Sequence, residues 1–242
     1  MNRPKKENEE FIHIASHDLQ APLRKLSTFV ERLTHKSREV LTEDMKLYLE
    51  KIESTVAAMR SLIDDLSVLS GISTANVEFV KCDVNEIMQQ LVRDFESALK
   101  THCPGISISK LPVLEANAVQ LKNAFKNIID NSIKFQDKTK ALQIVIRSEI
   151  VTIDEKIAFN LPVDKIFFKI EFSDNGIGFN PENIDKILQP FQRLHGKSDY
   201  PGNGLGLTIC KKIIENHRGI IYAMGNEISG TRFILILPET HD

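Results

Sequence analysis

The chain has 242 residues, 42% of them hydrophobic and 26% charged, which excludes a disordered protein and leaves room for one or two domains. The net charge is only −2, so the sequence lacks the excess of cations that nucleic-acid phosphates would attract. With three scattered cysteines, no CxxC pair, no signal peptide and no apolar run long enough for a bilayer, we expect a cytoplasmic protein without a zinc cage, a disulfide framework or a membrane segment.

The first 70 residues are predicted to form a helical hairpin with a short polar join at His35–Thr42. Apolar residues recur at alternating steps of three and four, the pattern of a coiled-coil or bundle seam. The expected seam positions are Ile12, Ala15, Leu19, Pro22, Leu26, Phe29 and Leu33, then Met45, Leu49, Ile52, Val56, Met59, Ile63 and Leu66. Because two helices alone leave much of both stripes exposed, we expect a homodimeric four-helix bundle through about residues 8–70. A dimerisation stalk without chemistry is the alternative.

From about Asn76 the pattern changes to mixed strands and helices. Strands are expected at Val77–Asp83, Ile106–Leu114, Leu142–Ile153, Lys165–Ser173, Ile220–Met224 and Thr231–Leu237, and helices at Val84–Lys100, Ala118–Phe135 and Asn203–Asn216. Asn117 is the expected N-cap of the middle helix, and Gly219 marks the stop of the last one. Without strict βαβ alternation, this order predicts an α/β sandwich with helices on one face of a mixed sheet. The predicted domains are residues 1–72 and residues 76–242.

Two glycine-rich stretches are candidate phosphate or nucleotide loops. Asp174-Asn-Gly176-Ile-Gly178 follows a predicted strand, and Gly202-Asn-Gly204-Leu-Gly206-Leu opens a predicted helix. Glycines let backbone N–H groups approach phosphate oxygens, and a helix N-terminus adds partial positive charge. Either motif alone is weak, and the second is no dinucleotide fingerprint because no βαβ unit surrounds it.

A third element makes the set more specific. Asn127, Asn131 and Lys134 are spaced i, i+4 and i+7, so they share one face of the helix predicted at Ala118–Phe135. Such polar residues are usually solvated, but here apolar residues surround them. An amide oxygen suits Mg²⁺, and a lysine suits a phosphate.

Together these motifs resemble the ATP-binding domain of sensor histidine kinases, within the ATPase superfamily that also holds gyrase, the 90-kilodalton heat-shock chaperone and the MutL proteins. The resemblance extends over Asn127-x3-Asn131-x2-Lys134-Phe135, Asp174-x-Gly176-x-Gly178, Pro190-Phe191-x-Arg193 and Gly202-x-Gly204-Leu205-Gly206-Leu207. Upstream, Ser16-His17-Asp18-Leu19-x2-Pro22-Leu23-Arg24 resembles the phosphoacceptor box of the phytochrome-like subgroup. The implied fold is a dimeric hairpin followed by an α/β sandwich of that superfamily.

For the second domain the resemblance implies bound ATP and Mg²⁺. Asp174 accepts from the adenine amino group, Gly176 and Gly178 leave room for the ring, Asn131 holds Mg²⁺, and Lys134 contacts a phosphate. Arg193 would reach the γ-phosphate, with a solvated lid arginine as the alternative, and residues 179–203 would form a lid. Phe135, Phe191, Gly202, Gly204, Leu205, Gly206 and Leu207 complete the expected ATP site.

Asn127 is expected to take part in both binding and catalysis. Relatives that hydrolyse ATP carry a glutamate at this place to activate water. An asparagine there favours transfer of the phosphoryl group over hydrolysis.

For the hairpin the resemblance implies autophosphorylation of His17 and transfer to an aspartate of a response regulator receiver domain. His17 projects away from the seam by its helical angle, and His13 is the local competitor. Asp18 would act as base and fix the imidazole tautomer. Pro22 removes the donor for the Asp18 carbonyl, which predicts a bend. Ala21 stands where many relatives have Thr or Asn, so phosphatase activity is in doubt unless Gln20 compensates.

Two rival functions remain at this point: a dimeric ATP-binding scaffold without kinase activity, and an ATPase of the gyrase or chaperone type. The intact motifs argue against the scaffold, and Asn127 with the acceptor box argues against the ATPase. The chain would then be a cytoplasmic kinase core, alone or as part of a longer sensor protein.

Overall fold

The computed structural model divides by its contacts into two compact units, one of residues 1–71 with 201–205 and the other of residues 72–200 with 206–242. The structure describes residues 3–36, 41–72, 78–96, 105–193, 200, 202–226 and 229–241. Among these residues, no helix has the length and the apolar character needed to cross a bilayer.

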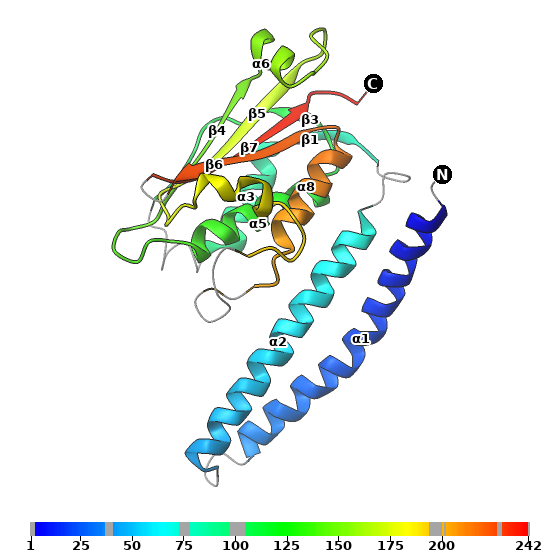
Figure 1. The fold of residues 1–242 in the computed structure, drawn as a ribbon, viewed down its shortest axis with the longest axis vertical. Coiled ribbons are helices and arrows are strands. Elements are labelled where there is room, and N and C mark those ends of the chain that lie inside the picture. The colour runs from blue at the N-terminus through cyan, green and yellow to red at the C-terminus, as the bar shows by residue number, and fades with distance from the viewer. Residues whose placement is uncertain are drawn as a thin grey trace. The chain divides into compact units, whose positions relative to one another are not determined.

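The first unit contains a helical hairpin, as the sequence predicts. Helix α1 (Arg3–Lys36) and helix α2 (Glu43–Gly71) lie side by side and run in opposite directions (Figure 1). Thr42 begins α2 as its N-cap, because its Oγ1 accepts from the N–H of Met45 at 3.3 Å. Helix α1 continues past Pro22. The bend expected at that residue stays a prediction.

The contact between the two helices uses a different stripe of α1 from the one predicted. Leu23, Val56 and Ile63 form the buried cluster of the hairpin, and Val30 is also buried on α1. In contrast, the predicted seam residues Leu19, Leu26, Phe29 and Leu33 are about half exposed. The apolar surface of α1 is wider than one seam, and a single neighbouring helix covers only the stripe that contains Leu23 and Val30. The other stripe stays exposed in this hairpin.

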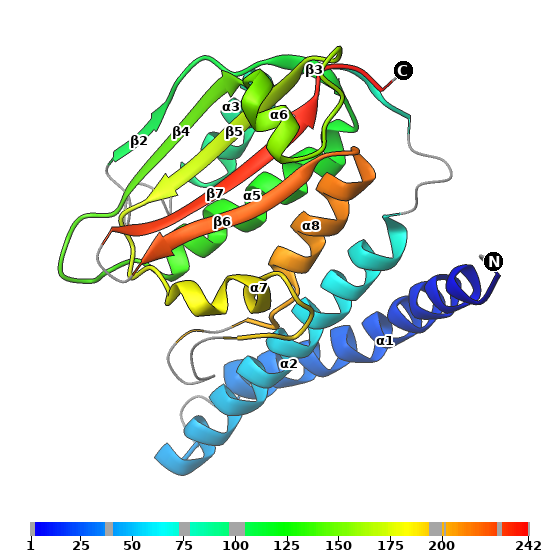
Figure 2. The ribbon, with the colours of Figure 1, turned by 45° about the horizontal axis from the view of Figure 1, so that its top comes forward.

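The second unit is built on a mixed five-stranded sheet in the order β2-β4-β5-β7-β6. Its strands are β2 (Gly105–Ile108), β4 (Gln143–Ile150), β5 (Phe167–Asp174), β6 (Ile220–Asn226) and β7 (Gly230–Pro238). Strands β2 and β4 are parallel, and the other neighbours are antiparallel. A separate two-stranded sheet pairs β1 (Val80–Asp83) with β3 (Val113–Ala116). Helices α3 (Val84–Asp94), α5 (Ala118–Lys134) and α8 (Gly206–Asn216) cover one face of the large sheet (Figure 2).

Successive side chains of β5 point to opposite faces of the sheet, so every second residue faces the helices. Ile170, Phe172 and Asp174 are the buried residues of the face that α5 covers, and the rings of Phe172 and Phe125 of α5 lie 5.2 Å apart. Residues between them, such as Ser173, face the opposite side of the sheet. Asp174 is therefore the last residue of an otherwise apolar row that points into the core between sheet and helices.

Several predicted elements match and others differ in detail. The capped helix after Asn117, the β4–β5 pair and the β6–β7 hairpin are confirmed. The strand predicted at Ile106–Leu114 is wrong, because β2 and β3 occupy its two ends and belong to different sheets. The helix predicted from Asn203 begins at Gly206. The helix predicted at Val84–Lys100 begins as expected but α3 ends earlier, at Asp94, where Phe95 is the C-cap; residues 97–100 lie outside the described residues.

The second face of the sheet is also covered, which corrects the expectation of helices on one face alone. Helix α6 (Ile153–Ala158) interrupts the strand predicted to reach Ile153, and a capping box between Thr152 and Glu155 starts it. A second core of Val151, Phe167, Ile234 and Ile236 lies on this face, with Phe159, Leu161, Ile220 and Tyr222 packed against it. Strand β7 is therefore buried on both faces.

Candidate functional site

The site begins at the buried carboxylate of Asp174, at the C-terminal end of β5. Its Oδ1 accepts from the backbone N–H of Gly176 at 2.9 Å and from that of Thr231 at 3.3 Å. Its Oδ2 accepts from the hydroxyl of Ser132 on α5 at 2.9 Å. Burial raises the pKa of Asp174 above its ordinary value, and the three donors act in the opposite direction.

The hydrogen-bond geometry leaves this carboxylate with capacity for a ligand. A carboxylate offers about four lone-pair directions, and the three donors occupy two on Oδ1 and one on Oδ2. The remaining direction belongs to Oδ2. Asp174 can therefore accept one further N–H, which is the contact that an exocyclic amino group would make.

Gly176 is required by the close approach of the loop after β5 to the end of α5. A Cβ at this position would lie 2.5 Å from the carbonyl oxygen of Phe135. That carbonyl accepts from the N–H of Ile177 at 3.0 Å, so the loop is fixed to the helix end. Gly178 has φ 65°, a conformation that favours glycine. The two glycines predicted to shape the pocket therefore have definite backbone roles beside it.

The start of β7 supplies two site residues, Gly230 and Thr231, that no sequence motif predicted. Gly230 has φ 83°, and a Cβ there would lie 2.1 Å from the carbonyl oxygen of Asp174. This glycine lets the next residue, Thr231, bring its N–H to the carboxylate. Ser132 was missed as well, because a serine on a helix carries no signal by itself. A Gly-Thr pair opening the last strand is the only signal the sequence offered.

Helix α5, which contacts this carboxylate through Ser132, also contains the three residues predicted from their spacing. Asn127 lies against the first turn of α8, since a Cβ on Gly206 would be 3.3 Å from its Oδ1. Asn131 is half-buried one turn further on. Lys134 ends the helix, and its Nζ lies 4.6 Å from the centre of the Phe135 ring.

Lys134 and Arg193 form a pair of neighbouring cations. Burial lowers the pKa of Lys134, and the positive charge of Arg193 lowers it further. The guanidinium of Arg193 donates from Nη2 to the carbonyl oxygen of Tyr200 at 2.5 Å, and the ring of Tyr200 lies 4.9 Å from that of Phe135. Two cations that repel each other attract an anion strongly, so this end of α5 suits a phosphate.

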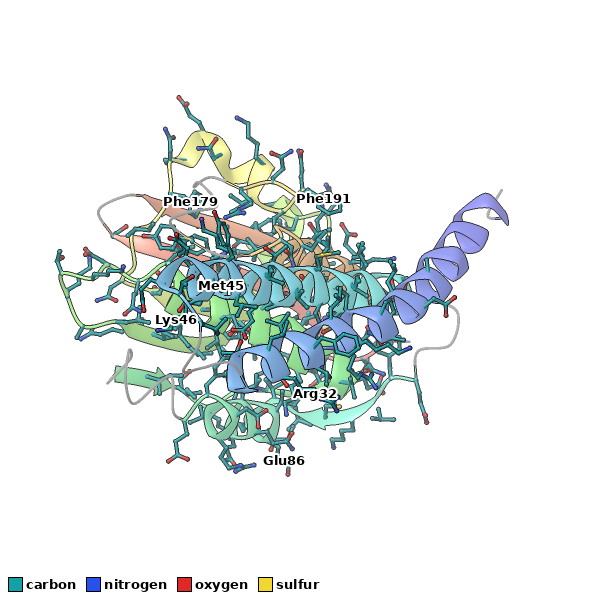
Figure 3. All side chains as sticks on the ribbon, turned by 90° about the horizontal axis from the view of Figure 1, so that it is seen from below. Arg32, Met45, Lys46, Glu86, Phe179 and Phe191 are labelled. Carbon is teal, nitrogen blue, oxygen red and sulfur yellow. The ribbon has the colours of Figure 1, made fainter. Side chains whose placement is uncertain are left out.

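The segment between β5 and Arg193 carries the short helices η1 (Pro181–Asn183) and α7 (Ile184–Ile187). Phe179 and Phe191 flank these helices (Figure 3). The ring of Phe179 is buried beside Gly225 of β6, whose Cβ would approach it to 3.1 Å. Phe191 is 60% exposed and has φ 60°, a rare conformation for a bulky residue. The segment is thus anchored by the buried Phe179 and strained at Phe191, and its expected role as a lid stays a prediction.

The second glycine motif is divided between the two units. Gly202 and Gly204 have φ 143° and 71°, and Leu205 is fully buried, but these residues group with the hairpin unit. Gly206 and Leu207 open α8 in the other unit. The expected role of Gly202, Gly204 and Leu205 at the nucleotide stays a prediction.

The predicted phosphoacceptor His17 lies in α1, but its side chain is outside the described residues, as is that of His13. Asp18 is exposed. Gln20 donates from its side-chain amide to Asp64 of α2 at 3.0 Å. That interaction ties the amide of Gln20 to the neighbouring helix.

The residues present fit Mg²⁺ held largely by a ligand's phosphates. Across the described part of the chain, no group of three or more His, Cys, Asp or Glu side chains is placed to hold a metal ion. Asn131 offers an amide oxygen beside the Lys134 end of α5, and Mg²⁺ commonly takes one or two protein oxygens together with phosphates and water.

Comparison with family models covers most of the chain. Residues 116–241, more than half of it, match the model described as histidine kinase-, DNA gyrase B- and HSP90-like ATPase. Residues 7–74 match the His Kinase A (phospho-acceptor) domain. The two matches cover the α5–β7 region with Asp174 and the α1–α2 hairpin with His17.

Curated relatives agree with these matches. Phytochrome-like protein Cph1 of Synechocystis is 33% identical over 239 residues, which are 98% of this chain and 30% of that protein. Cyanobacterial phytochrome A of Nostoc is 32% identical over 238 residues, covering 98% and 29%. Sensor protein kinase WalK of Staphylococcus aureus is 26% identical over 243 residues, covering 96% and 54%. The chain thus spans about 30% of the length of the phytochromes it matches.

Solved structures share the fold. Full-length ShkA in complex with AMPPNP has a TM-score of 0.67 at 19% identity, covering 96% of this chain and 46% of that one. The nucleotide-free catalytic domain of histidine kinase ThkA has a TM-score of 0.53 at 25% identity, covering 68% and 100%. With its hairpin, its α/β sheet and both family matches, the chain belongs to the histidine kinase-, DNA gyrase B- and HSP90-like ATPase family and carries the phosphoacceptor domain of histidine kinases in front of it.

Proposed function

We propose that this chain is the core of a two-component sensor histidine kinase. It binds ATP with Mg²⁺, transfers the γ-phosphoryl group to His17, and passes that group to an aspartate of a response regulator. Residues 1–72 are the dimerisation and phosphotransfer domain, and residues 76–242 are the ATP-binding catalytic domain. We place this core in the cytoplasm, as part of a longer sensor protein.

One observation carries the nucleotide assignment. The buried Asp174 has one acceptor direction left, and α5, which contacts it through Ser132, ends at Lys134 beside a second cation, Arg193. An acceptor for a base amino group and a cationic pair for phosphates are the two ends of an adenine nucleotide site. Asn131 lies on α5 next to Ser132, three residues before Lys134, and would hold Mg²⁺, which neutralises phosphate charge when bound.

Transfer to His17 is favoured over hydrolysis because Asn127 offers no carboxylate to activate water. In the transfer, a ring nitrogen of His17 bonds to the γ-phosphorus while the bond to the bridging oxygen of ADP breaks. The proton of the other ring nitrogen passes to Asp18. Lys134 and Arg193 stabilise the charge that spreads over the phosphoryl oxygens. Gly202, Gly204 and Leu205 would close over the phosphates with Gly206 and Leu207.

Homodimerisation through the hairpin is supported by the stripe that α2 does not cover. Leu19, Leu26, Phe29 and Leu33 of α1 and Met45, Ile52 and Met59 of α2 are each about half exposed. So large an apolar surface on two adjacent helices is typical of an interface. A second hairpin would cover it in a four-helix bundle.

Labelling with ATP that carries the label on its γ-phosphate tests the proposal. We expect Mg²⁺-dependent incorporation of a label that is lost in acid and stable in alkali, as a phosphoramidate requires. Nucleotide binding without labelling would instead indicate a scaffold. Release of labelled free phosphate without labelled protein would indicate an ATPase.

A further inference from the structure

Ser132 lies in the core between α5 and the sheet, one residue after Asn131. It is 4% exposed, and its Oγ lies 2.9 Å from Oδ2 of Asp174 and 3.3 Å from the carbonyl oxygen of Ile128, one turn back on the same helix. A hydroxyl has one proton, so it can make only one of these contacts well. The shorter one, to an ionised acceptor, is the stronger.

We propose that Ser132 is a positioning residue for the nucleotide base: its hydroxyl donates to the Asp174 carboxylate and turns the last free lone pair of Oδ2 toward the amino group of the base. This inference rests on the proposed ATP-binding function. It assigns to Ser132 an effect on binding that operates only through Asp174.

The hydroxyl of Ser132 differs in kind from the other donors to Asp174. Gly176 and Thr231 donate from their backbone N–H groups, which remain after any change of side chain that keeps the loop in place. Among the described residues, Ser132 provides the side-chain donor to this carboxylate. It also donates to the same oxygen, Oδ2, that has the open direction. Its loss would therefore affect both the charge and the orientation of the acceptor.

No charged group takes over this role in the described surroundings of Asp174. The pKa of Asp174 responds to burial and to its three uncharged donors. The packed elements carry ionisable side chains, among them Asp130 and Lys134 of α5, Arg147 of β4 and Arg232 of β7, and none of these has a resolved effect on the pKa of Asp174. Ionisation of Asp174 thus depends on hydrogen bonds, and removing one of them raises its pKa further.

The test compares Ser132→Ala with Ser173→Ala, a matched change on the residue beside Asp174 whose side chain faces the other side of the sheet. The carboxyl carbon of Asp174 is titrated by NMR in the nucleotide-free protein, and the affinity for a fluorescent ATP analogue is measured across about pH 5.5 to 8.5. We expect Ser132→Ala to raise the pKa of Asp174. Its affinity should match the wild type within about threefold at the alkaline end and fall up to about tenfold below it at the acidic end. Ser173→Ala should titrate as the wild type does.

An unchanged titration of Asp174 in Ser132→Ala overturns the inference, as does an equal loss of affinity at every pH. If the alanine variant folds poorly, Ser132→Cys tests the same inference, because a thiol fills the space of the hydroxyl but is a weak hydrogen-bond donor. We expect that variant to give an intermediate shift. If the wild type fails to bind the analogue at any pH, the proposed function fails, while the NMR titration still decides the role of Ser132.

Discussion

Asp174→Asn separates recognition of the nucleotide from stability of the fold. The asparagine Oδ1 can keep both backbone donors, Gly176 and Thr231, and its Nδ2 can donate to the hydroxyl of Ser132 where the carboxylate accepted from it. The free direction of Oδ2 becomes an N–H, which opposes a base amino group. The fold thus keeps its contacts while the site loses its acceptor.

Asp174→Asn should lower the affinity for the nucleotide without lowering the stability of the nucleotide-free protein. A hydrogen bond to a charged acceptor contributes about 1.5–3 kcal/mol, so nucleotide affinity should fall by about tenfold to about 150-fold, with or without Mg²⁺. Because burial raises the folded pKa of Asp174, its ionised form costs folding free energy at pH values above that pKa. At about pH 8 the nucleotide-free variant should therefore unfold at the same urea concentration as the wild type or at a higher one.

Titration with a fluorescent ATP analogue, in Mg²⁺ and in chelator, measures the first effect, and urea unfolding measures the second. Glu171→Gln is the matched control, since it makes the same carboxylate-to-amide change on the opposite face of β5. Wild-type affinity in Asp174→Asn would refute the assignment of this pocket. A parallel loss of stability and affinity would show that Asp174 only holds the fold.

Other changes test the remaining parts of the account. His17→Gln should abolish acid-labile labelling and leave binding of the ATP analogue unchanged; full labelling would move the acceptor elsewhere. Asn131→Asp should change the Mg²⁺ dependence of phosphotransfer while binding in chelator suffers less, and equal losses under both conditions would argue against a metal ligand. Leu26→Asp places a charge in the exposed stripe of α1 and should give monomers at micromolar concentration in sedimentation, whereas an intact dimer would place the interface elsewhere. Burial lowers the pKa of His217 to about 4, so its unfolded form binds more protons below its ordinary pKa of about 6.5. About 3 kcal/mol of stability should be lost as the pH falls through that window, and urea unfolding of His217→Gln should show a flatter pH profile.

Local signals explain what the sequence could predict. Asn117 accepts from the N–H of Gln120 as the cap of α5, because capping depends on residues a few positions apart. The shared face of Asn127, Asn131 and Lys134 follows from helical spacing alone. These features required no knowledge of distant neighbours.

The residues that complete the pocket depend on contacts distant in sequence. Thr231 reaches Asp174 only because β5 pairs with β7, and Gly230 is required only because Asp174 lies behind it. Ser132 gains its partner across 42 positions of sequence. No spacing rule on one helix identifies such partners, so the sequence predicted the acceptor and missed the groups that orient it.

In the hairpin, the sequence likewise predicts the helices but not how they pack. Heptad spacing predicts both helices, but it does not say which apolar stripe meets the neighbouring helix and which meets another chain. Leu23 is buried against α2, while Leu26, one turn away, is about half exposed. The choice depends on the rotation of one helix against the other, which sequence periodicity leaves open.

The position of the phosphoryl group on the protein distinguishes a histidine kinase from an ATPase and from a scaffold. The chain is incubated with ATP and Mg²⁺, digested without exposure to acid, and its peptides are sequenced by mass spectrometry. The account predicts one phosphoryl group on the imidazole of His17, absent when Asp174→Asn is used at limiting ATP. Phosphorylation of another residue, or ATP that is bound and hydrolysed while His17 stays unmodified, would contradict it.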